Sequence, residues 1–157
     1  MRYKKFNSLF NVDYKFNNKI FAFFIKKMIK NGKKILAQKI FYKSLKKICK
    51  IYNFFKKKQI INFIKKIVKL VVLKYEIKKK KIGNTIINIP FLIKNKNKRY
   101  KLGINLILYF SKKNKLNGFS KKLVEELINT YKKKSLSYKK KMEIYKQIKI
   151  NKSFIKK

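Results

Sequence analysis

Apolar residues recur at helical spacing along most of the chain, which predicts a largely α-helical protein. The first helical run covers residues 20–29 and stops at Asn31-Gly32, a pair typical of helix ends. A second helix is predicted to present on one face Ala37, Phe41, Leu45, Ile48 and Tyr52. A polar break at residues 56–58 precedes a third helix, whose apolar face consists of Ile60, Ile64, Ile67 and Val71.

The period of the pattern changes to two after the third helix. Apolar and polar residues alternate on both sides of Gly83-Asn84, a pair that favours a tight turn between antiparallel strands. Pro90 suits an edge strand, where a missing N–H costs no ladder hydrogen bond. A β-hairpin is therefore predicted at about residues 74–93. Because two strands alone are only marginally stable, we expect the hairpin to project from a helical body with its tip held by a partner.

The rest of the chain returns to helical spacing. A fourth helix is predicted over residues 102–110. Asn117-Gly118 interrupts the chain, and Ser120 is the expected N-cap of a fifth helix that ends at the lysine run 132–134. A last helix is predicted over residues 140–154.

The predicted fold class is mainly α, a bundle of about six helices with one protruding β-hairpin. Residues 1–16 form an extended basic N-terminal arm in this prediction, and residues 17–157 form a single helical domain that includes the hairpin. The pattern contains no internal repeat and no second domain.

The charge balance is the next constraint. Lys and Arg number 47 against 5 Asp and Glu, which gives a formal net charge of +42 over 157 residues. Hydrophobic residues still make up 46% of the chain, unlike a disordered basic tail. Such a chain repels itself and favours a polyanion as partner, either nucleic acid or an anionic membrane surface, with an acidic protein as a weaker third.

Lysine supplies nearly all of this charge, since the only arginines are Arg2 and Arg99. Lysine meets phosphates as a point charge, whereas arginine makes forked contacts to bases and phosphates. Recognition is therefore expected to depend on backbone shape, as with structured RNA, and to weaken steeply with salt. Lys, Ile, Asn, Phe and Tyr are encoded by A- and T-rich codons, so part of the lysine excess reflects an AT-rich genome.

Candidate catalytic chemistry is sparse. The chain has no histidine and a single cysteine, Cys49, expected to be a buried, inert thiol; no disulfide and no Cys/His metal site can be built. The five acids are scattered except Glu125-Glu126, expected to be solvated near a helix start. No glycine-rich phosphate loop is present. The longest uncharged apolar run, residues 102–110, is too short to span a membrane. The sequence thus predicts no enzyme and no cofactor.

Basic clusters on the folded scaffold remain as candidate sites. Lys33-Lys34 stands at a helix N-terminus, where the dipole disfavours cations, so a bound anion would explain it; a solvated turn is the alternative, and the sequence favours neither. The run 78–81 is expected at the hairpin tip, as a finger in a groove or as charge that keeps an edge strand soluble. Residues 139–141 are expected at the start of the last helix. The aromatic residues mostly follow apolar faces and are assigned to the core.

Three segments in this order resemble the small-subunit ribosomal protein seven family, in its bacterial and organellar form. The match covers roughly residues 13–154, and an Asp13-Tyr14 pair stands at its beginning. The segments are Gly32-Lys33-Lys34 followed by Ala37, Lys80-Lys81-Ile82-Gly83 followed by Ile89-Pro90, and Lys139-Lys140-Lys141 followed by Asn151 and Phe154.

The resemblance implies a six-helix bundle with a protruding hairpin and no catalytic role. It also implies binding to the 3′ major domain of small-subunit ribosomal RNA, nucleation of head assembly, and a hairpin near the exit-site transfer RNA and the messenger path. Expected partners are other head proteins and a platform protein, without a membrane and without homo-oligomers. The candidate RNA-binding residues are Arg2, Lys4, Lys5, Lys33, Lys34, Lys78, Lys79, Lys80, Lys81, Gly83, Asn84, Lys98, Arg99, Lys139, Lys140 and Lys141.

Two other function classes fit the charge. A cationic amphipathic protein could lie on a membrane surface, but it needs no projecting hairpin. A nonspecific RNA chaperone needs the charge but not the patterned core. The codon bias and the absence of a presequence pattern favour a ribosome-bound protein inside an organelle, a non-photosynthetic plastid first and a mitochondrion second.

Overall fold

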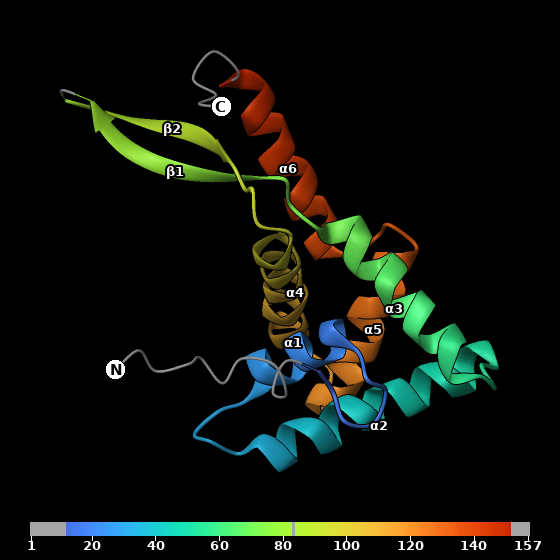
Figure 1. The fold of residues 1–157 in the computed structure, drawn as a ribbon. Helices are drawn as coiled ribbons and strands as arrows, with labels where there is room; N and C mark the ends of the chain where they lie inside the picture. The colour runs from blue at the N-terminus through green and yellow to red at the C-terminus, as the bar shows by residue number, and fades with distance from the viewer. Residues whose placement is uncertain (1–11, 83, 152–157) are drawn as a thin grey trace, which may run out of the picture.

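The computed structural model describes residues 12–82 and 84–151, and it shows six helices and one antiparallel β-hairpin among them (Figure 1). The elements are α1 (Lys19–Met28), α2 (Lys34–Tyr52), α3 (Lys57–Val71), β1 (Tyr75–Ile82), β2 (Thr85–Leu92), α4 (Lys96–Lys113), α5 (Phe119–Tyr131) and α6 (Leu136–Ile150). The predicted fold class, a mainly α bundle with a protruding hairpin, is confirmed.

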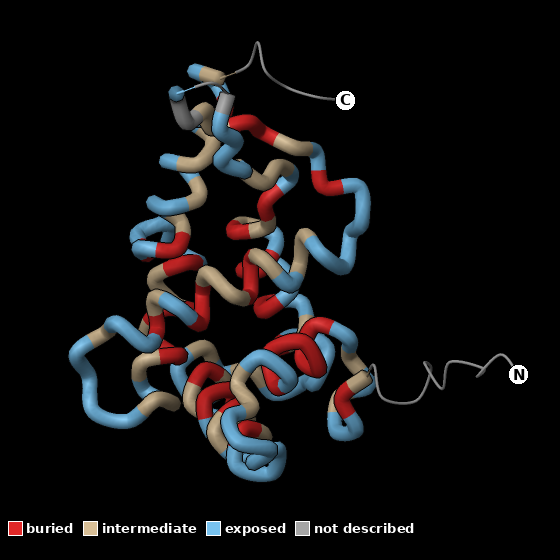
Figure 2. The backbone as a smooth tube through the Cα atoms, turned by 90° about the vertical axis from the view of Figure 1, so that its left-hand side faces the viewer, coloured by how far each residue is buried: buried red, intermediate tan, exposed pale blue. Residues whose placement is uncertain are grey.

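The core lies where the apolar faces of the helices meet, with α4 in contact with α1, α3, α5 and α6. Buried residues follow the inner sides of the helices and exposed residues the outer sides (Figure 2). The predicted faces of the second and third helices are confirmed, except that Tyr52 is only half-buried. The largest fully buried side chains include Phe21, Phe24, Phe41, Ile48, Ile64, Ile67, Ile104, Ile107, Leu123 and Leu127.

Gly103 allows α4 to pack closely against the end of α3. A Cβ atom at this position would lie 3.3 Å from the carbonyl carbon and oxygen of Val71 and from Cα of Val72. These are backbone atoms, which cannot move aside as a flexible side chain can. The short distance between the two helices therefore depends on a residue without a side chain.

Helix caps explain where the predicted boundaries were wrong. The fourth helix begins at Lys96, earlier than predicted, because the Asn95 side chain accepts hydrogen bonds from the first-turn N–H groups of Asn97 and Lys98. The last helix begins at Leu136, because the Ser135 side chain accepts a hydrogen bond from the N–H of Tyr138. This helix ends at Ile150. The predicted end of this helix at residue 154 lies outside the described residues.

The prediction of Ser120 as the N-cap of the fifth helix was also wrong. Gly118 holds that position with a φ of +85°, and Ser120 is the second residue of the helix. Glycine adopts this left-handed conformation without steric cost, so the chain turns there without a side-chain cap. Similarly, the break before α3 is shorter than predicted, because α3 already begins at Lys57.

Glu126 is buried rather than solvated, in contrast to the prediction for this pair of acids. Its Oε1 accepts a hydrogen bond from the Ser137 hydroxyl at 2.7 Å and another from the Ser137 N–H at 3.2 Å. The hydroxyls of Thr130, Ser135 and Ser137 contact one another in the same buried cluster. Glu125 is half-buried and accepts a hydrogen bond from Asn114. Glu126 thus joins α5 to the first turn of α6.

Asp13 fixes the chain that leads into α1. Its carboxylate accepts hydrogen bonds from the hydroxyl of Tyr42 in α2 and from the N–H of Phe16. Burial and the Asp13 carboxylate raise the pKa of Tyr42 far above its usual value, so the tyrosine stays protonated as the donor. Residues 14–16 form a turn here, so the predicted extended arm is wrong for this part; residues 1–11 lie outside the described residues.

Cys49 is half-buried rather than fully buried, at the edge of the apolar core. Burial raises the pKa of its thiol, which keeps the group protonated and unreactive at neutral pH. The expectation of an inert thiol therefore has a physical basis, although the side chain is less buried than predicted.

Replacing Glu126 by alanine is expected to lower the free energy of unfolding by about 1–3 kcal/mol, because the buried Ser137 donors lose their acceptor. Urea denaturation at high salt, which screens the net charge, measures this change. The matched control is Glu143→Ala, which removes an exposed carboxylate paired with Lys140 and should cost less than about 0.5 kcal/mol. Equal losses in the two variants would contradict the assigned role of Glu126.

Candidate nucleic-acid interface

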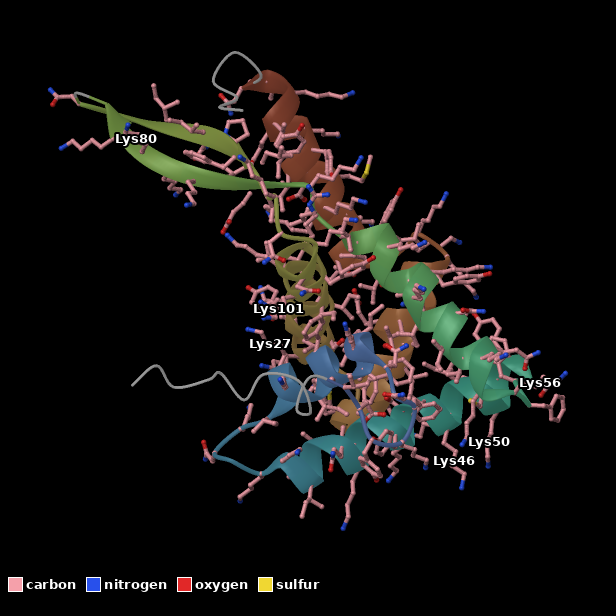
Figure 3. All side chains as sticks on the ribbon, viewed as in Figure 1. Lys27, Lys46, Lys50, Lys56, Lys80 and Lys101 are labelled. Atoms are coloured by element: carbon pink, nitrogen blue, oxygen red, sulfur yellow. The ribbon has the colours of Figure 1, made fainter. Side chains whose placement is uncertain are left out.

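One side of the molecule carries two projections with helices between them. The β1–β2 hairpin and the α1–α2 turn, residues 29–33, both extend towards the left in Figure 1, with α4 and α1 between them. Figure 3 shows Lys80 on the hairpin, Lys101 on α4 and Lys27 on α1 along this side. We call this surface, made by the hairpin, α4, α1 and the α1–α2 turn, the basic face.

The α1–α2 turn places two lysines at the N-terminus of α2. Asn31 and Gly32 have φ values of +49° and +71°, which reverse the chain after α1. Lys33 occupies the N-cap position and Lys34 the first helical position, both exposed, and no side chain caps this helix. The prediction that these two lysines stand at a helix N-terminus is confirmed. The N–H of Lys34 already donates to the carbonyl oxygen of Gly32 at 2.7 Å, so an outside acceptor at this turn would have to meet the N–H groups that follow it in the first turn of α2.

The hairpin lysines lie along a strand rather than at the tip, which corrects the prediction. β1 continues to Ile82, so residues 78–81 all pair with β2, from Lys78 opposite Ile89 to Lys81 opposite Ile86. Successive side chains of a strand point to opposite faces, so the four exposed lysines charge both faces of the ribbon. Asn84 is an exposed turn residue, and Gly83 lies outside the described residues.

Lys98 and Arg99 brace the base of the hairpin against α4. Lys98 Nζ lies 2.6 Å from Glu76 Oε2 in β1, and Arg99 Nε donates a hydrogen bond of 2.6 Å to the carbonyl oxygen of Ile93. Both were predicted as RNA-binding residues. Their contacts within the protein tie the base of the hairpin to α4, and the Lys98 side chain remains half exposed.

The lysines of the last helix differ from one another. Because α6 begins at Leu136, residues 139–141 lie inside the helix and not at its free N–H groups, so the pattern of the α1–α2 turn is not repeated. Lys139 is exposed, whereas Lys140 pairs with Glu143 at 2.7 Å. Lys141 Nζ donates a hydrogen bond of 2.7 Å to the carbonyl oxygen of Leu70 near the end of α3. Burial, with a smaller effect of the neighbouring Lys74 charge, lowers the pKa of Lys141.

The basic face includes lysines that the sequence interpretation missed. Lys27 is exposed in the last turn of α1, and Lys101 is exposed on α4 with its Nζ 5.4 Å from the centre of the Phe23 ring. The helical phase of α4 would have identified Lys101 once the true start of that helix was known. Lys46, Lys50 and Lys56 gather at the far end of α2, away from this face (Figure 3). Arg2, Lys4 and Lys5 lie outside the described residues.

The described part of the chain lacks two other kinds of site. Among those residues, no three acidic, cysteine or histidine side chains form a group that could hold a metal ion. None of the helices built from them has the length and apolar character needed to cross a bilayer. The concentration of exposed lysines is thus the feature on which a functional assignment depends.

Comparison with known proteins identifies relatives over almost the whole chain. Residues 1–152 match the family model of ribosomal protein S7p/S5e. The small ribosomal subunit protein uS7 of Carsonella ruddii is 43% identical over 142 residues, which cover 90% of this chain and 88% of the relative. The uS7c protein of Euglena gracilis is 34% identical over 139 residues, 88% and 86% of the two chains.

A third relative, uS7 of Natranaerobius thermophilus, is 29% identical over 144 residues, 92% of this chain and 89% of that protein. The matched proteins are named as ribosomal proteins of the small subunit rather than as enzymes, in agreement with the absence of catalytic chemistry in the sequence. The similarity extends across the helices, the hairpin and the α1–α2 turn that form the basic face. The chain therefore belongs to the ribosomal protein S7p/S5e family, a family of small-subunit ribosomal proteins.

Proposed function

We propose that this protein is a structural constituent of an organellar small ribosomal subunit that binds the 3′ major domain of the ribosomal RNA and nucleates assembly of the head. The observation that carries the proposal is the basic face, where exposed lysines from the hairpin, α4, α1 and the α1–α2 turn share one side of the molecule. The one acidic residue of the hairpin, Glu76, is already paired with Lys98. This face therefore presents an almost uniform positive potential to RNA phosphates.

The geometry supports a bridging mode of binding. The hairpin and the α1–α2 turn extend from opposite ends of the basic face, so each can follow a different RNA segment (Figure 1). Lysines on both faces of the ribbon suit a groove with phosphates on either side. A protein that holds two segments together lowers the cost of bringing them into one domain, which is how it would nucleate assembly. The hairpin is placed near the exit-site transfer RNA and the messenger path in this proposal.

The neighbours and compartment follow from the same assignment. Other head proteins and a platform protein are the proposed protein partners, with no membrane and no homo-oligomer. Relatives named uS7c, from Euglena gracilis, Prototheca wickerhamii and Bigelowiella natans, support a plastid, with a mitochondrion as the second choice. The AT-rich codon usage fits a small organellar genome. A cationic membrane-surface protein and a nonspecific RNA chaperone remain the alternatives, and neither explains the match to a ribosomal family.

Hydroxyl-radical footprinting tests the proposed binding. The RNA is the small-subunit ribosomal RNA from the genome that encodes the chain, at moderate salt with excess transfer RNA as competitor. We expect compact protection within the 3′ major domain. The variant Lys33→Glu/Lys34→Glu should weaken binding about tenfold or more, because two phosphate contacts become repulsive.

The control for charge alone is Lys46→Glu/Lys50→Glu, which makes the same change at exposed positions away from the basic face. This variant should keep the protected positions and lose less affinity than the variant of the α1–α2 turn. Diffuse protection that transfer RNA erases would favour the chaperone or the membrane-surface alternative. Equal losses of RNA affinity in both variants would contradict the assignment of the basic face as the RNA-binding surface.

The two lysines Lys139 and Lys141 provide a separate test within one helix. Lys141→Gln is expected to lower the free energy of unfolding by about 1 kcal/mol, because the charged hydrogen bond to the Leu70 carbonyl is weakened. Lys139→Gln, at an exposed position two residues away, should leave the free energy of unfolding unchanged. It should also reduce the slope of the logarithm of the RNA-binding constant against the logarithm of the salt concentration by the amount that corresponds to about one phosphate contact. Urea denaturation and binding titrations across salt concentrations measure the two effects, and the reverse result would contradict this division.

A further inference from the structure

A groove of about 390 Å³ lies beside the α1–α2 turn, between α2 and the α4–α5 end of the bundle. Its lining is mostly apolar and includes Leu36 and Ile40 of α2, Leu108 of α4 and Phe119 of α5. This volume falls within the range of pockets that bind small organic groups, about 300–1,000 Å³. Ala37 and Leu108 of its lining belong to the hydrophobic core, so the groove opens onto the edge of that core.

The lysines around the groove define the charge of its occupant. Lys27, Lys30, Lys33 and Lys112 all line it, and no acidic residue of the described segments does. Three of the four come from α1 and the α1–α2 turn, and Lys112 comes from the opposite wall at the end of α4. A ligand that complements this arrangement has a compact apolar part flanked by negative charges on more than one side.

An unpaired nucleotide has this combination of properties. Its base offers a flat face that packs on apolar and aromatic side chains, and its two flanking phosphates lie outside the pocket that holds the base. The groove also adjoins the turn that ends the basic face, where the proposed RNA backbone runs. An acidic peptide with one apolar side chain is the other possible occupant, but it lacks this continuity with the RNA surface.

We propose that the groove receives one unpaired base of the ribosomal RNA, with its flanking phosphates held by the surrounding lysines. The inference rests on the proposed function and adds to it a site that reads a single-stranded position. Lysine contacts along the basic face recognise only the backbone, so this groove supplies a contact that a continuous duplex cannot make.

The test compares two neighbouring positions at the start of α2. Leu36 lines the groove and is 53% exposed, whereas Ile35 is 68% exposed and does not line this groove. Leu36→Asn removes the apolar contact without changing charge, and Ile35→Asn is the matched control. Both positions are in the first turn of α2 and outside the core, so both variants should fold; circular dichroism checks this.

Each protein is bound to the same ribosomal RNA, and the complex is probed with base-specific reagents and with hydroxyl radicals. With the wild type and with Ile35→Asn, one unpaired base inside the footprint is expected to lose its reactivity. With Leu36→Asn this base should become reactive again while the backbone protection remains, and affinity should fall about fivefold to tenfold, at the lower end of the range for losing one stacked base. Lys112→Gln should weaken binding without restoring full reactivity of the base.

The outcomes separate this inference from the proposed function. Loss of the backbone footprint with the wild type would contradict the proposed function itself. An intact footprint in which no base depends on Leu36 would overturn the groove assignment alone. In a reconstituted small subunit, a photoreactive residue at position 36 should crosslink to RNA; a crosslink to a protein would show that a peptide fills the groove, which also overturns the inference.

Discussion

Repulsion among lysines is the constraint on which the rest of this structure depends. A net charge of +42 on 157 residues opposes any compact state, and five acidic residues are too few to neutralise it. The chain folds by placing its apolar faces inward and its lysines outward, with α4 and α5 each packed against four other helices. The same arrangement leaves positive charge unbalanced at the surface, so a polyanion that binds only the folded chain would stabilise it.

The scarce acids are used mainly to hold the chain together. Asp13 anchors the segment before α1 to Tyr42, Glu126 joins α5 to α6, and Glu76 helps to orient the hairpin. Placing carboxylates at these joints ties together elements whose lysines repel one another. The exposed lysines of the basic face then have few carboxylates beside them, which favours binding to an RNA backbone.

Periodicity was enough to predict the helices, the hairpin and the fold class, because the apolar stripes are strong and the glycine and asparagine turns are distinct. Periodicity did not predict the helix boundaries that a capping side chain sets, nor the burial of a residue whose partner lies far along the chain. Asn95 and Ser135 extend two helices beyond their apolar stripes, and Glu126 is buried because residues eleven positions later fold over it. The lysines at residues 33–34 could be predicted from their position directly after Gly32. Lys101 could not be placed on an exposed helix face because the predicted α4 began after it.

In a lysine-rich chain, residue type alone cannot separate lysines that bind RNA from lysines that support the fold. Lys139 and Lys141 belong to one run, yet one is exposed and the other holds the end of α3. The distinction comes from what lies within reach of each ammonium group: the Lys141 ammonium donates to the carbonyl oxygen of Leu70 inside the protein, whereas the Lys139 side chain on α6 is exposed to solvent. Position in the fold, rather than local charge density, therefore shows which of these lysines support the fold.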